Sequence, residues 1–577
     1  MRHNFLSAFI QIRLKTYLAI LCILFVCTFY WGLLSLKPFT QHSQIKNRQL
    51  KFKYWEWICD PNSQQCKRRI PGIVSFGTSL STCLMTCGPV QIWPLPTGTL
   101  SLSRNTFSFN HKQIKTNIIT SHKRVEEKLI KCLQLLKKNI EVIDREEDGG
   151  LLENEVIVTV TVTGSINDVR YMLNTDETYR LLISKNISTI NVAIHALTYL
   201  GARHGLETLS QLIWRDDESK CLKIIDKAVI HDSPYFTYRG LLLDTKHQHI
   251  PLRAIYRTLD GMAMNKLNVF HWYLPYSRYT GYTNSEVYTK DDVRAVTEYA
   301  DLRGIRVSVE IDTANHTGFE IDYGDSTPCN TPPRESSCSV LPCENTNSTK
   351  SNTTRVVSEK YTDFLNLTGS DFIHIGGEFS DAVDSRCQNQ SSEVTKTEYK
   401  NNGLVLDSYV GNTTGSHGGN IKHFIVWSKS FDSNNLNSST TIIQSRVESL
   451  WNELERFANE KFRVIVSHRD KWYLDKLPHW TTVYRHRPWA DLEMSLRDYA
   501  LGGEACVWTH TIDEHSMDTL MWPQAAALAE RLWSDPEDHL DGVMTRLSTQ
   551  RERMVSRGID ASVLGPKWCL QNPNECN

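Results

Sequence analysis

The chain has 577 residues, which is enough for three or four domains of ordinary size or for one large barrel with a smaller partner. Its 64 Lys and Arg residues nearly balance 65 Asp and Glu residues, so the basic surplus typical of nucleic-acid-binding proteins is absent. Charged residues make up 22% and aromatic residues 10% of the chain, which excludes a wholly disordered polypeptide.

A long uncharged segment lies near the N-terminus. Residues 16–36 carry no charge over 21 positions, and a helix of that length can cross a bilayer. Arg2, Arg13 and Lys15 precede the segment, and positive charge there favours a cytoplasmic N-terminus. We therefore expect a cytoplasmic tail at 1–15 and a transmembrane signal anchor at 16–36. The alternative is a cleaved signal peptide, which is less favoured because the exit sequence Leu-Ser-Leu-Lys-Pro has no small-residue cleavage pattern.

Features beyond this segment predict a lumenal or extracellular body, and hence a single-pass type II membrane protein of the secretory pathway, Golgi or plasma membrane. Glycosylation acceptor sequences N-x-[ST] occur at eight positions: Asn186, Asn315, Asn347, Asn352, Asn366, Asn389, Asn412 and Asn437. Most cysteines outside the apolar segment are expected to form disulfides in an oxidising compartment. Cys83-x3-Cys87 is interpreted as part of a disulfide framework, because no nearby His completes a metal site.

The pattern of residues divides the body into three parts. Residues 37–90 hold four cysteines and predict a stem with a small disulfide-tied knot. Residues 156–162 alternate with period two and 181–183 form a second strand candidate, whereas 190–200 place apolar residues at helical spacing. Strands with a covering helix predict an α+β domain over 91–232.

From residue 233 to 577, short apolar runs alternate with helical stretches. The predicted strands are 239–244, 267–274, 306–312, 372–378, 423–427, 441–444, 463–467 and 501–508. Helices are predicted at 251–264, 290–302, 357–365, 449–460 and 522–532. This repeat predicts the α/β fold class, with a (β/α)8 TIM barrel at 233–577.

Polar and aromatic residues gather at or just beyond the carboxyl ends of these strands. They are Asp244, His271, Trp272, Glu310, Asp312, Glu378, Trp427, Tyr473, Asp475 and Trp508. Charge on a buried strand is costly, so the set favours a functional site over salt bridges that close the rim. The P-loop, G-x-S-x-G and H-E-x-x-H motifs do not occur in the sequence. We expect a neutral ring-shaped ligand, sugar cleavage, and neither a metal nor a cofactor.

Longer motifs resemble family 20 β-N-acetylhexosaminidases. They are GARHGLETLSQ at 201–211, RGLLLDT at 239–245, NKLNVFHW at 265–272, RGIRV at 303–307, HIGG at 374–377, WYLD at 472–475, GGEAC at 502–506 and AERLW at 529–533. The likeness runs in order from about residue 90 to 560. WEWIC at 55–59 and SLSTC at 79–83 further resemble membrane-tethered insect hexosaminidases of the fused-lobes type.

The resemblance implies removal of terminal N-acetylglucosamine from N-glycans or chitooligosaccharides. The expected partners are that carbohydrate and, through the anchor, a membrane, with no nucleic acid; a homodimer is left open. In this family the substrate's own acetamido oxygen attacks the anomeric carbon, an Asp orients the acetamide, and the next Glu protonates the leaving oxygen. The implied substrate-binding residues are Arg239, His316, Trp427, Tyr473, Asp475 and Trp508. Of these, we expect Arg239, Asp475 and Trp508 to line one pocket.

The chain departs from the family pattern in the strand-four motif H-x-G-G-D-E. Here the motif ends in Glu378 and Phe379. Without a gap, Glu378 stands in the Asp slot; with a one-residue deletion, it is the acid. A deletion would disturb the strand register, so the ungapped alignment is preferred, and Glu378 is the catalytic candidate in either case.

Other positions differ from the family as well. Tyr276 replaces a supporting Asp, Arg446 stands where a pocket Trp is usual, and His510 stands where a Glu is usual. In strand three, Ala314 and Asn315 replace Pro-Gly. Two hypotheses follow. One is a membrane-anchored hexosaminidase with an altered site, and the other is a catalytically impaired relative that binds glycans or glycoproteins.

Overall fold

The structure, a computed structural model, describes most of the body of the chain. It describes residues 55–69, 77–88, 90–144, 154–164, 171–274, 286–310, 363–376, 423–428, 436–447, 451–537, 540 and 542–568. The predicted anchor at 16–36 lies outside these residues. Among the helices that the structure does describe, none is long and apolar enough to span a bilayer.

Two disulfides tie the first described segment into a knot. It consists of the antiparallel pair β1 (Trp57–Asp60) and β2 (Gln65–Arg68) and the helix α2 (Leu80–Thr86). The bonds Cys59–Cys87 and Cys66–Cys83 join the pair to the helix, which confirms the predicted disulfide framework. With so small an apolar core, the knot depends on these crosslinks for stability.

The knot is anchored to the following domain by a buried carboxylate. The hydroxyls of Ser79 and Thr82 donate hydrogen bonds to Asp216, the latter over 2.6 Å. Burial raises the pKa of Asp216, but hydrogen bonds from Ser219, Ser79 and Thr82 outweigh it and hold the pKa below its usual range. The carboxylate is therefore ionised, and the knot packs on the body of the protein.

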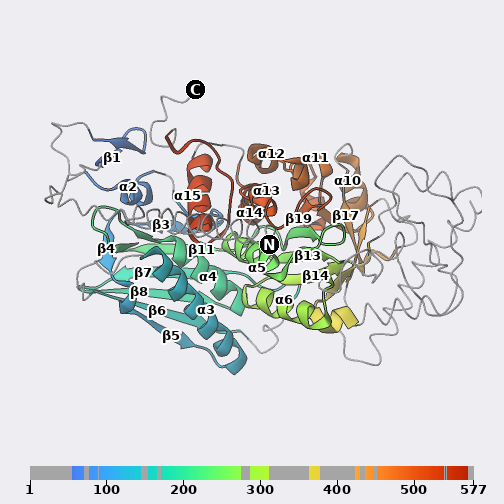
Figure 1. Ribbon diagram of the computed structural model, residues 1–577, viewed down its shortest axis with the longest axis horizontal. Helices are drawn as coiled ribbons and strands as arrows, with labels where there is room; N and C mark the ends of the chain where they lie inside the picture. Colours follow the sequence, from blue (N-terminus) through green and yellow to red (C-terminus); the bar gives the residue numbers. More distant parts are fainter. Residues whose placement is uncertain are drawn as a thin grey trace, which may run out of the picture. The chain divides into compact units, whose positions relative to one another are not determined.

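The N-terminal domain is built on a six-stranded sheet with the order β3-β11-β7-β8-β6-β5. The strands are β3 (Leu100–Leu102), β5 (Ile114–Ile119), β6 (Glu155–Val162), β7 (Tyr179–Lys185), β8 (Thr189–Ala196) and β11 (Ala228–Asp232). A smaller sheet contains β4 (Thr106–Phe109), β9 (Ile213–Arg215) and β10 (Leu222–Ile225). The helices α3 (Lys123–Ile143) and α4 (Tyr199–Gln211) complete the predicted α+β domain, with a short 3-10 turn at His111–Gln113 (Figure 1).

The helix predicted at 190–200 is wrong. Residues Thr189–Ala196 form β8, which pairs with β6 and β7 on either side, and the helix α4 begins at Tyr199. Ile190, Val192 and Ile194 are buried, whereas His195 is exposed, so the segment also follows the period of two. Both periodicities fit such a short apolar run, and the two neighbouring strands decide between them.

Eight parallel strands close into the predicted barrel in chain order. They are β12 (Tyr238–Asp244), β13 (Val269–Tyr273), β14 (Arg306–Glu310), β15 (Phe372–His374), β16 (His423–Trp427), β17 (Thr441–Ser445), β18 (Arg463–Val466) and β19 (Ala500–Val507). Nearly every residue in them is buried, because helices cover the outside and side chains fill the inside. Such strands read as continuous apolar runs, which is why all eight were predictable.

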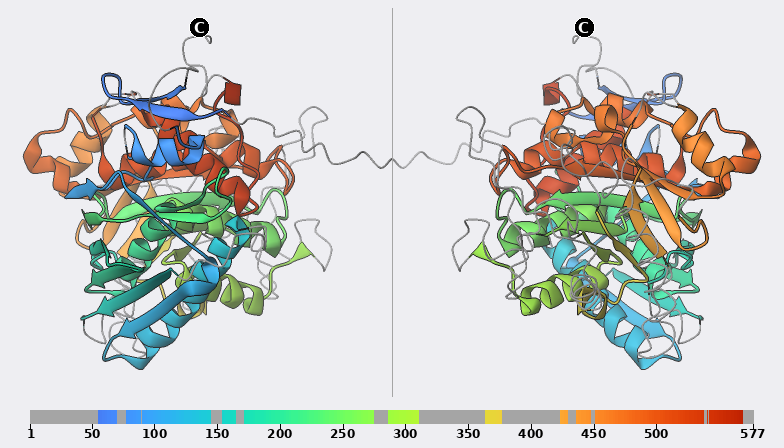
Figure 2. Two further views of the ribbon diagram at one scale, coloured as in Figure 1. Left: turned by 90° about the vertical axis from the view of Figure 1, so that its left-hand side faces the viewer. Right: turned by 90° about the vertical axis from the view of Figure 1, so that its right-hand side faces the viewer.

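Helices surround this barrel. They are α5 (Leu252–Met264), α6 (Lys290–Leu302), α10 (Trp451–Asn459), α11 (Arg469–Trp472), α12 (Trp480–Arg485), α13 (Met517–Met521), α14 (Gln524–Ser534) and α15 (Val543–Ser556), with 3-10 turns η6 (Leu474–Lys476) and η7 (Met494–Tyr499). The predicted helices at 251–264, 290–302, 449–460 and 522–532 correspond to α5, α6, α10 and α14. The helix predicted at 357–365 falls mostly outside the described residues. The barrel and the N-terminal domain lie against each other (Figures 1 and 2).

Candidate active site at the mouth of the barrel

The strand register places four polar side chains side by side at the carboxyl rim. Asp244 of β12 is level with Tyr273 of β13, Tyr273 with Glu310 of β14, and Glu310 with His374 of β15. All four are buried. In a parallel barrel the strand ends meet at one mouth, where such enzymes build their sites.

Aromatic rings from four elements line this mouth. Tyr273, Trp427, Tyr473 and Trp508 belong to one buried cluster. The ring of Trp508 lies 5.8 Å from Tyr273, 6.0 Å from Tyr473 and 6.5 Å from Trp427. Flat apolar faces of this kind suit the C–H faces of a sugar ring.

Arg446 packs against the same aromatic cluster, which forms the wall of the mouth. Its guanidinium carbon lies 4.6 Å from the ring centre of Trp427 and 5.5 Å from that of Trp508, and its Nε donates a hydrogen bond of 2.6 Å to the Tyr473 hydroxyl. A cation therefore stacks where the family pattern has an aromatic ring. This makes the wall more polar than the aromatic residues alone predict.

Several buried polar atoms at the mouth have no hydrogen-bond partner among the described residues. They include Oδ1 of Asp475, Nε1 of Trp508 and Oγ1 of Thr509. Burial raises the pKa of Asp475, since the charged carboxylate is poorly solvated there. Buried polar groups are almost always satisfied in proteins, so these three atoms indicate a place for a bound polar ligand.

A buried ionic network supports the wall from inside the barrel. His271 lies between two carboxylates, with Nε2 2.9 Å from Glu310 and Nδ1 2.9 Å from Glu504. Burial lowers the pKa of His271, but Glu504 and Glu310 outweigh it and raise the pKa to about 10. Glu310 in turn accepts a hydrogen bond of 2.9 Å from Nε1 of Trp427, so the network fixes the orientation of this ring.

The ligand atoms of His271, Glu310 and His374 lie within 4.8 Å of one another, close enough to consider a metal. The charge state argues against that use. A His271 ring that is protonated on both nitrogens has no lone pair to offer a metal. Burial and the neighbouring charge of His271 lower the pKa of His374 well below its usual value. We therefore interpret the group as a charged His271, which offsets the negative charge of Glu310 and Glu504, beside a neutral His374.

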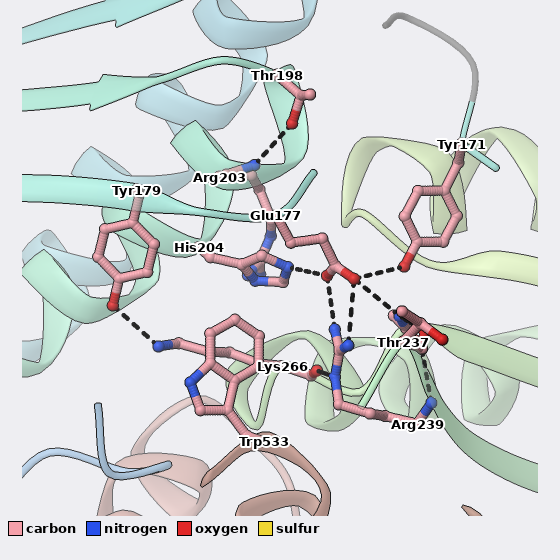
Figure 3. Close-up of polar contacts among 12 residues, drawn as sticks. Tyr171, Glu177, Tyr179, Thr198, Arg203, His204, Thr237, Arg239, Lys266 and Trp533 are labelled. Carbon is pink, nitrogen blue, oxygen red and sulfur yellow. Dashed lines mark hydrogen bonds and ion pairs between the residues drawn. The ribbon is translucent and has the colours of Figure 1, made fainter. Parts of the chain in front are cut away.

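The structure contradicts the predicted place of Arg239. This residue is the second of β12 and lies at the amino end of the barrel, opposite the mouth, with no exposed surface. Figure 3 shows its guanidinium against Glu177 of the N-terminal domain, with Nη2 2.6 Å from the carboxylate. Burial raises the pKa of Glu177, but Arg239 and His204 lower it to about 2. Arg239 joins the two domains, and the sequence motif alone does not reveal which end of the strand it occupies.

The other predicted site residues divide into two groups. Trp427, Tyr473, Asp475 and Trp508 come together at the mouth, as expected. His316 and Glu378 lie outside the described residues. The expectation that Asp475 and Trp508 share a pocket with Arg239 is wrong for Arg239.

Sequence reasoning missed one residue at the mouth, His247. His247 follows β12 and binds Asp244 through Nδ1 over 2.6 Å, and its ring centre lies 4.2 Å from that of His510, which follows β19. The strand-end position of Asp244 was noted, but a His three residues later carries no pattern of its own. Only closure of the barrel between β12 and β19 brings it to His510.

Enzymes with an eight-stranded α/β barrel build their sites at its carboxyl mouth, and the aromatic rings and unsatisfied polar atoms there suit a polar, ring-shaped ligand. The profile for the "Glycosyl hydrolase family 20, catalytic domain" matches residues 236–277 and 275–536. A second profile, "beta-acetyl hexosaminidase like", matches residues 92–212. The chain therefore belongs to glycoside hydrolase family 20, and by homology it is a β-N-acetylhexosaminidase.

Individual relatives agree with this family. The chain is 33% identical to the probable β-hexosaminidase fdl of Drosophila melanogaster over 91% of each chain. It is 29% identical to the chitooligosaccharidolytic β-N-acetylglucosaminidase of Ostrinia furnacalis, over 90% of this chain and 95% of that one. Among solved structures, the exo-β-N-acetylglucosaminidase of Vibrio harveyi has the same fold, with a TM-score of 0.64 at 19% identity over 82% of this chain and 79% of that one.

Proposed function

We propose that the protein hydrolyses terminal non-reducing N-acetylglucosamine from N-glycans or chitooligosaccharides by a substrate-assisted, retaining mechanism. The observation that carries the proposal is the mouth itself. Trp427 and Trp508 offer apolar faces there, and Oδ1 of Asp475 is buried without a partner among the described residues. A sugar ring supplies both an apolar face and the hydroxyls that such a carboxylate needs.

The proposed proton donor is Glu378, the carboxylate left in the strand-four motif. The acetamido oxygen of the substrate would attack the anomeric carbon while Glu378 protonates the leaving oxygen and later activates water. With Glu378 as the acid, the residue before it is Gly377, so the motif supplies no carboxylate to orient the acetamide. We therefore expect turnover well below that of a site with both carboxylates.

A second candidate function is glycan binding without turnover. The observation that favours it is Arg446, whose guanidinium stacks on Trp427 and hydrogen-bonds to Tyr473. Such a residue changes the shape and charge of the wall that would enclose the acetamide. In this case the mouth would retain affinity for sugars, and substrate positioning would be lost.

Release of a chromogenic aglycone from an N-acetylglucosaminide tests the proposal. Glu378→Gln keeps the side-chain shape but removes the proton, so it should abolish hydrolysis and leave sugar binding nearly unchanged. Glu378→Asp combined with Phe379→Glu restores the family pair and should raise the rate about 10²-fold or more. Equal rates for wild type and Glu378→Gln would exclude Glu378 as the acid. An inactive wild type with intact sugar binding, not rescued by the double variant, would support the second candidate.

We further propose that the body faces the lumen, attached to the membrane through residues 16–36, and that it carries N-glycans. Two disulfides in the knot support an oxidising compartment. Asn186 and Asn437, the acceptors of two predicted glycosylation sequences, are both exposed. Enzymatic deglycosylation of protein expressed in eukaryotic cells should lower its apparent mass on a gel, whereas an unchanged mobility would exclude the lumenal assignment.

A further inference from the structure

His374, the last residue of β15, holds the turn that follows this strand. The backbone N–H of Gly376 donates a hydrogen bond of 3.1 Å to Nδ1 of His374. Both residues are buried, and Gly376 has φ +68°, a left-handed conformation that glycine adopts without strain. In the sequence, Glu378, the proposed acid, follows only two residues later. The turn therefore sets the direction in which the chain leaves the strand just before Glu378.

This hydrogen bond fixes the tautomer of His374. A backbone N–H can only donate, so Nδ1 must carry a lone pair, and the proton of the neutral ring lies on Nε2. Burial and the neighbouring charge of His271 lower the pKa of His374 well below its usual value, which keeps the ring neutral. Oε2 of Glu310 also lies 3.4 Å from Nδ1, but it is closer, at 2.9 Å, to the protonated Nε2 of His271.

Gln444 provides the acceptor that this tautomer needs. Its Nε2 donates hydrogen bonds to Oγ of Ser467 over 2.8 Å and to Oε1 of Glu504 over 2.7 Å. Because a carboxylate only accepts, the amide nitrogen must face Glu504, and the amide oxygen is left for another donor. That oxygen and Nε2 of His374 are both buried without another partner among the described residues, and the interaction of the two side chains favours a proton on the ring. Nε2–H of His374 is therefore the donor to Oε1 of Gln444.

We propose that His374 is a positioning residue for the reaction: its Nδ1 holds the turn before Glu378, and Gln444 keeps that nitrogen free to accept. If Nδ1 carried the proton instead, two N–H groups would face each other and the turn would lose its hydrogen bond. Glu504 completes the chain of contacts because it orients the amide of Gln444. The inference rests on the proposed function in taking Glu378 as the acid.

Two substitutions separate the two nitrogens of His374. The side-chain oxygen of Asn can occupy the position of Nδ1, so His374→Asn keeps the acceptor for Gly376 and loses the donor to Gln444. The side-chain nitrogen of Gln can occupy the position of Nε2, so His374→Gln keeps the donor and loses the acceptor. A purely structural role of the buried ring predicts similar effects of the two changes. Positioning through Nδ1 predicts that only His374→Gln damages the turn.

Hydrogen exchange of the Gly376 amide, resolved by mass spectrometry of overlapping fragments of the full-length protein, measures the turn directly. We expect about tenfold faster exchange in His374→Gln and nearly unchanged exchange in His374→Asn. Gln444→Met should act like His374→Gln, although the Gly376 amide bonds to His374, because the proton of the ring can then move to Nδ1. The control is Ser308→Ala, which removes a buried hydroxyl level with His271 in the same barrel and should leave the exchange unchanged.

Release of a chromogenic aglycone from an N-acetylglucosaminide measures the effect on the reaction. A displaced acid lowers kcat more than it changes KM. We expect kcat to fall about 10²-fold in His374→Gln with KM changed less than about threefold, whereas His374→Asn should stay within about tenfold of the wild-type kcat. Near-ultraviolet circular dichroism shows whether each variant is folded. Should His374→Gln fail to fold, Gln444→Met provides the same comparison with His374→Asn.

Fast exchange of Gly376 in both His374 variants, or in neither, would overturn the proposal, and so would equal losses of kcat in an active enzyme. If the exchange follows the expected pattern but the wild type does not hydrolyse the substrate, the proposed function fails and the role of His374 in holding the turn stands. If the wild type is active and His374→Gln keeps both its kcat and the slow exchange, the positioning role fails alone.

Discussion

At the scale of single residues, Glu177 carries the contact between the two domains. Its carboxylate accepts hydrogen bonds from Arg239, His204 and Asn268. Figure 3 shows His204 of the N-terminal domain and Arg239 of the barrel meeting at Glu177. Because all of them are buried, each charge depends on its partner for the solvation that water would otherwise provide.

Replacing Glu177 by Gln should destabilise the protein strongly. Arg239 would keep its charge with no countercharge nearby, and breaking a buried pair in this way costs about 3–5 kcal/mol in the free energy of unfolding. Urea denaturation followed by tryptophan fluorescence measures the change. Asp291→Asn, which breaks an exposed ion pair with Arg294, is the control and should have little effect. Similar losses in the free energy of unfolding for the two variants would show that the buried pair contributes no more than an exposed one.

A second prediction at this scale concerns Trp508 at the mouth. If its ring stacks on a sugar, Trp508→Ala should weaken binding of N-acetylglucosamine by about 1–3 kcal/mol. Trp55→Ala, a partly exposed tryptophan of the disulfide knot, serves as the control and should bind normally. Calorimetry on both variants gives the comparison, and normal binding by Trp508→Ala would remove this ring from the sugar site.

At the scale of elements, the barrel closes through an irregular pairing of β18 with β19. Val464 is opposite Ala500, but Ile465 is opposite Gly502, so Leu501 is an extra residue in β19. Gly502 has φ +133°, a backbone conformation that glycine adopts readily and other residues rarely do. A Cβ built at this position would also lie 2.0 Å from the Tyr238 carbonyl oxygen. At this bulge the backbone of β19 therefore lies so close to β12 that a side chain at residue 502 has no room.

Gly502→Ala should therefore cost more than an ordinary glycine substitution. Backbone strain should lower the free energy of unfolding by about 1–3 kcal/mol, and the close contact should lower it by about 1–3 kcal/mol more. Gly369 also has a positive φ, +62°, but nothing lies within 4 Å of a Cβ built there, so Gly369→Ala shows the strain alone. Thermal unfolding of the two variants tests this difference. An equal fall in Tm would mean that the strand shifts to relieve the contact.

At the scale of the whole molecule, buried histidines of two kinds set the pH dependence of stability. Burial lowers the pKa of His204 to about 4, that of His468 to about 4 and that of His486 to about 3. Carboxylates raise the pKa of His271 to about 10 against the effect of burial. The first three are neutral in the folded state near pH 6, and His271 is charged.

Stability should therefore fall on both sides of a maximum near pH 6.5. As the pH drops from 6.5 towards 4, His204, His468 and His486 bind protons in the unfolded chain but stay neutral in the folded protein. The free energy of unfolding therefore falls. As the pH rises from 6.5 towards 10, the folded state gradually loses the stabilisation from protonated His271, which is fully present below 6.5. Each imidazole contributes a slope of up to about 1.4 kcal/mol per pH unit.

Urea denaturation at intervals between pH 4 and pH 10 measures this profile. His195→Gln removes an exposed imidazole and should leave the profile unchanged. A free energy of unfolding that stays constant between pH 6.5 and pH 4 would show that the buried histidines titrate normally. A constant value between pH 6.5 and pH 9 would show that His271 is not held in its charged form.

The sequence by itself determined the elements of the barrel and the kind of residue at its mouth. Strands buried on both sides must be continuously apolar, and charged or aromatic residues at their carboxyl ends stand out against that background. Trp427, Tyr473, Asp475 and Trp508 were therefore recognisable. The four-cysteine knot was recognisable as well, because its cysteines lie close together in a short segment.

Only the tertiary structure decided which distant residues meet. Residues 190–196 became a strand because β6 and β7 flank them, and Arg239 became a contact between domains because Glu177 faces the amino end of β12. His247 meets His510 because β19 closes on β12. The physical reason is the same in each case. Local periodicity reports which side of an element is buried, whereas charge pairing and site geometry depend on neighbours that are remote in the sequence.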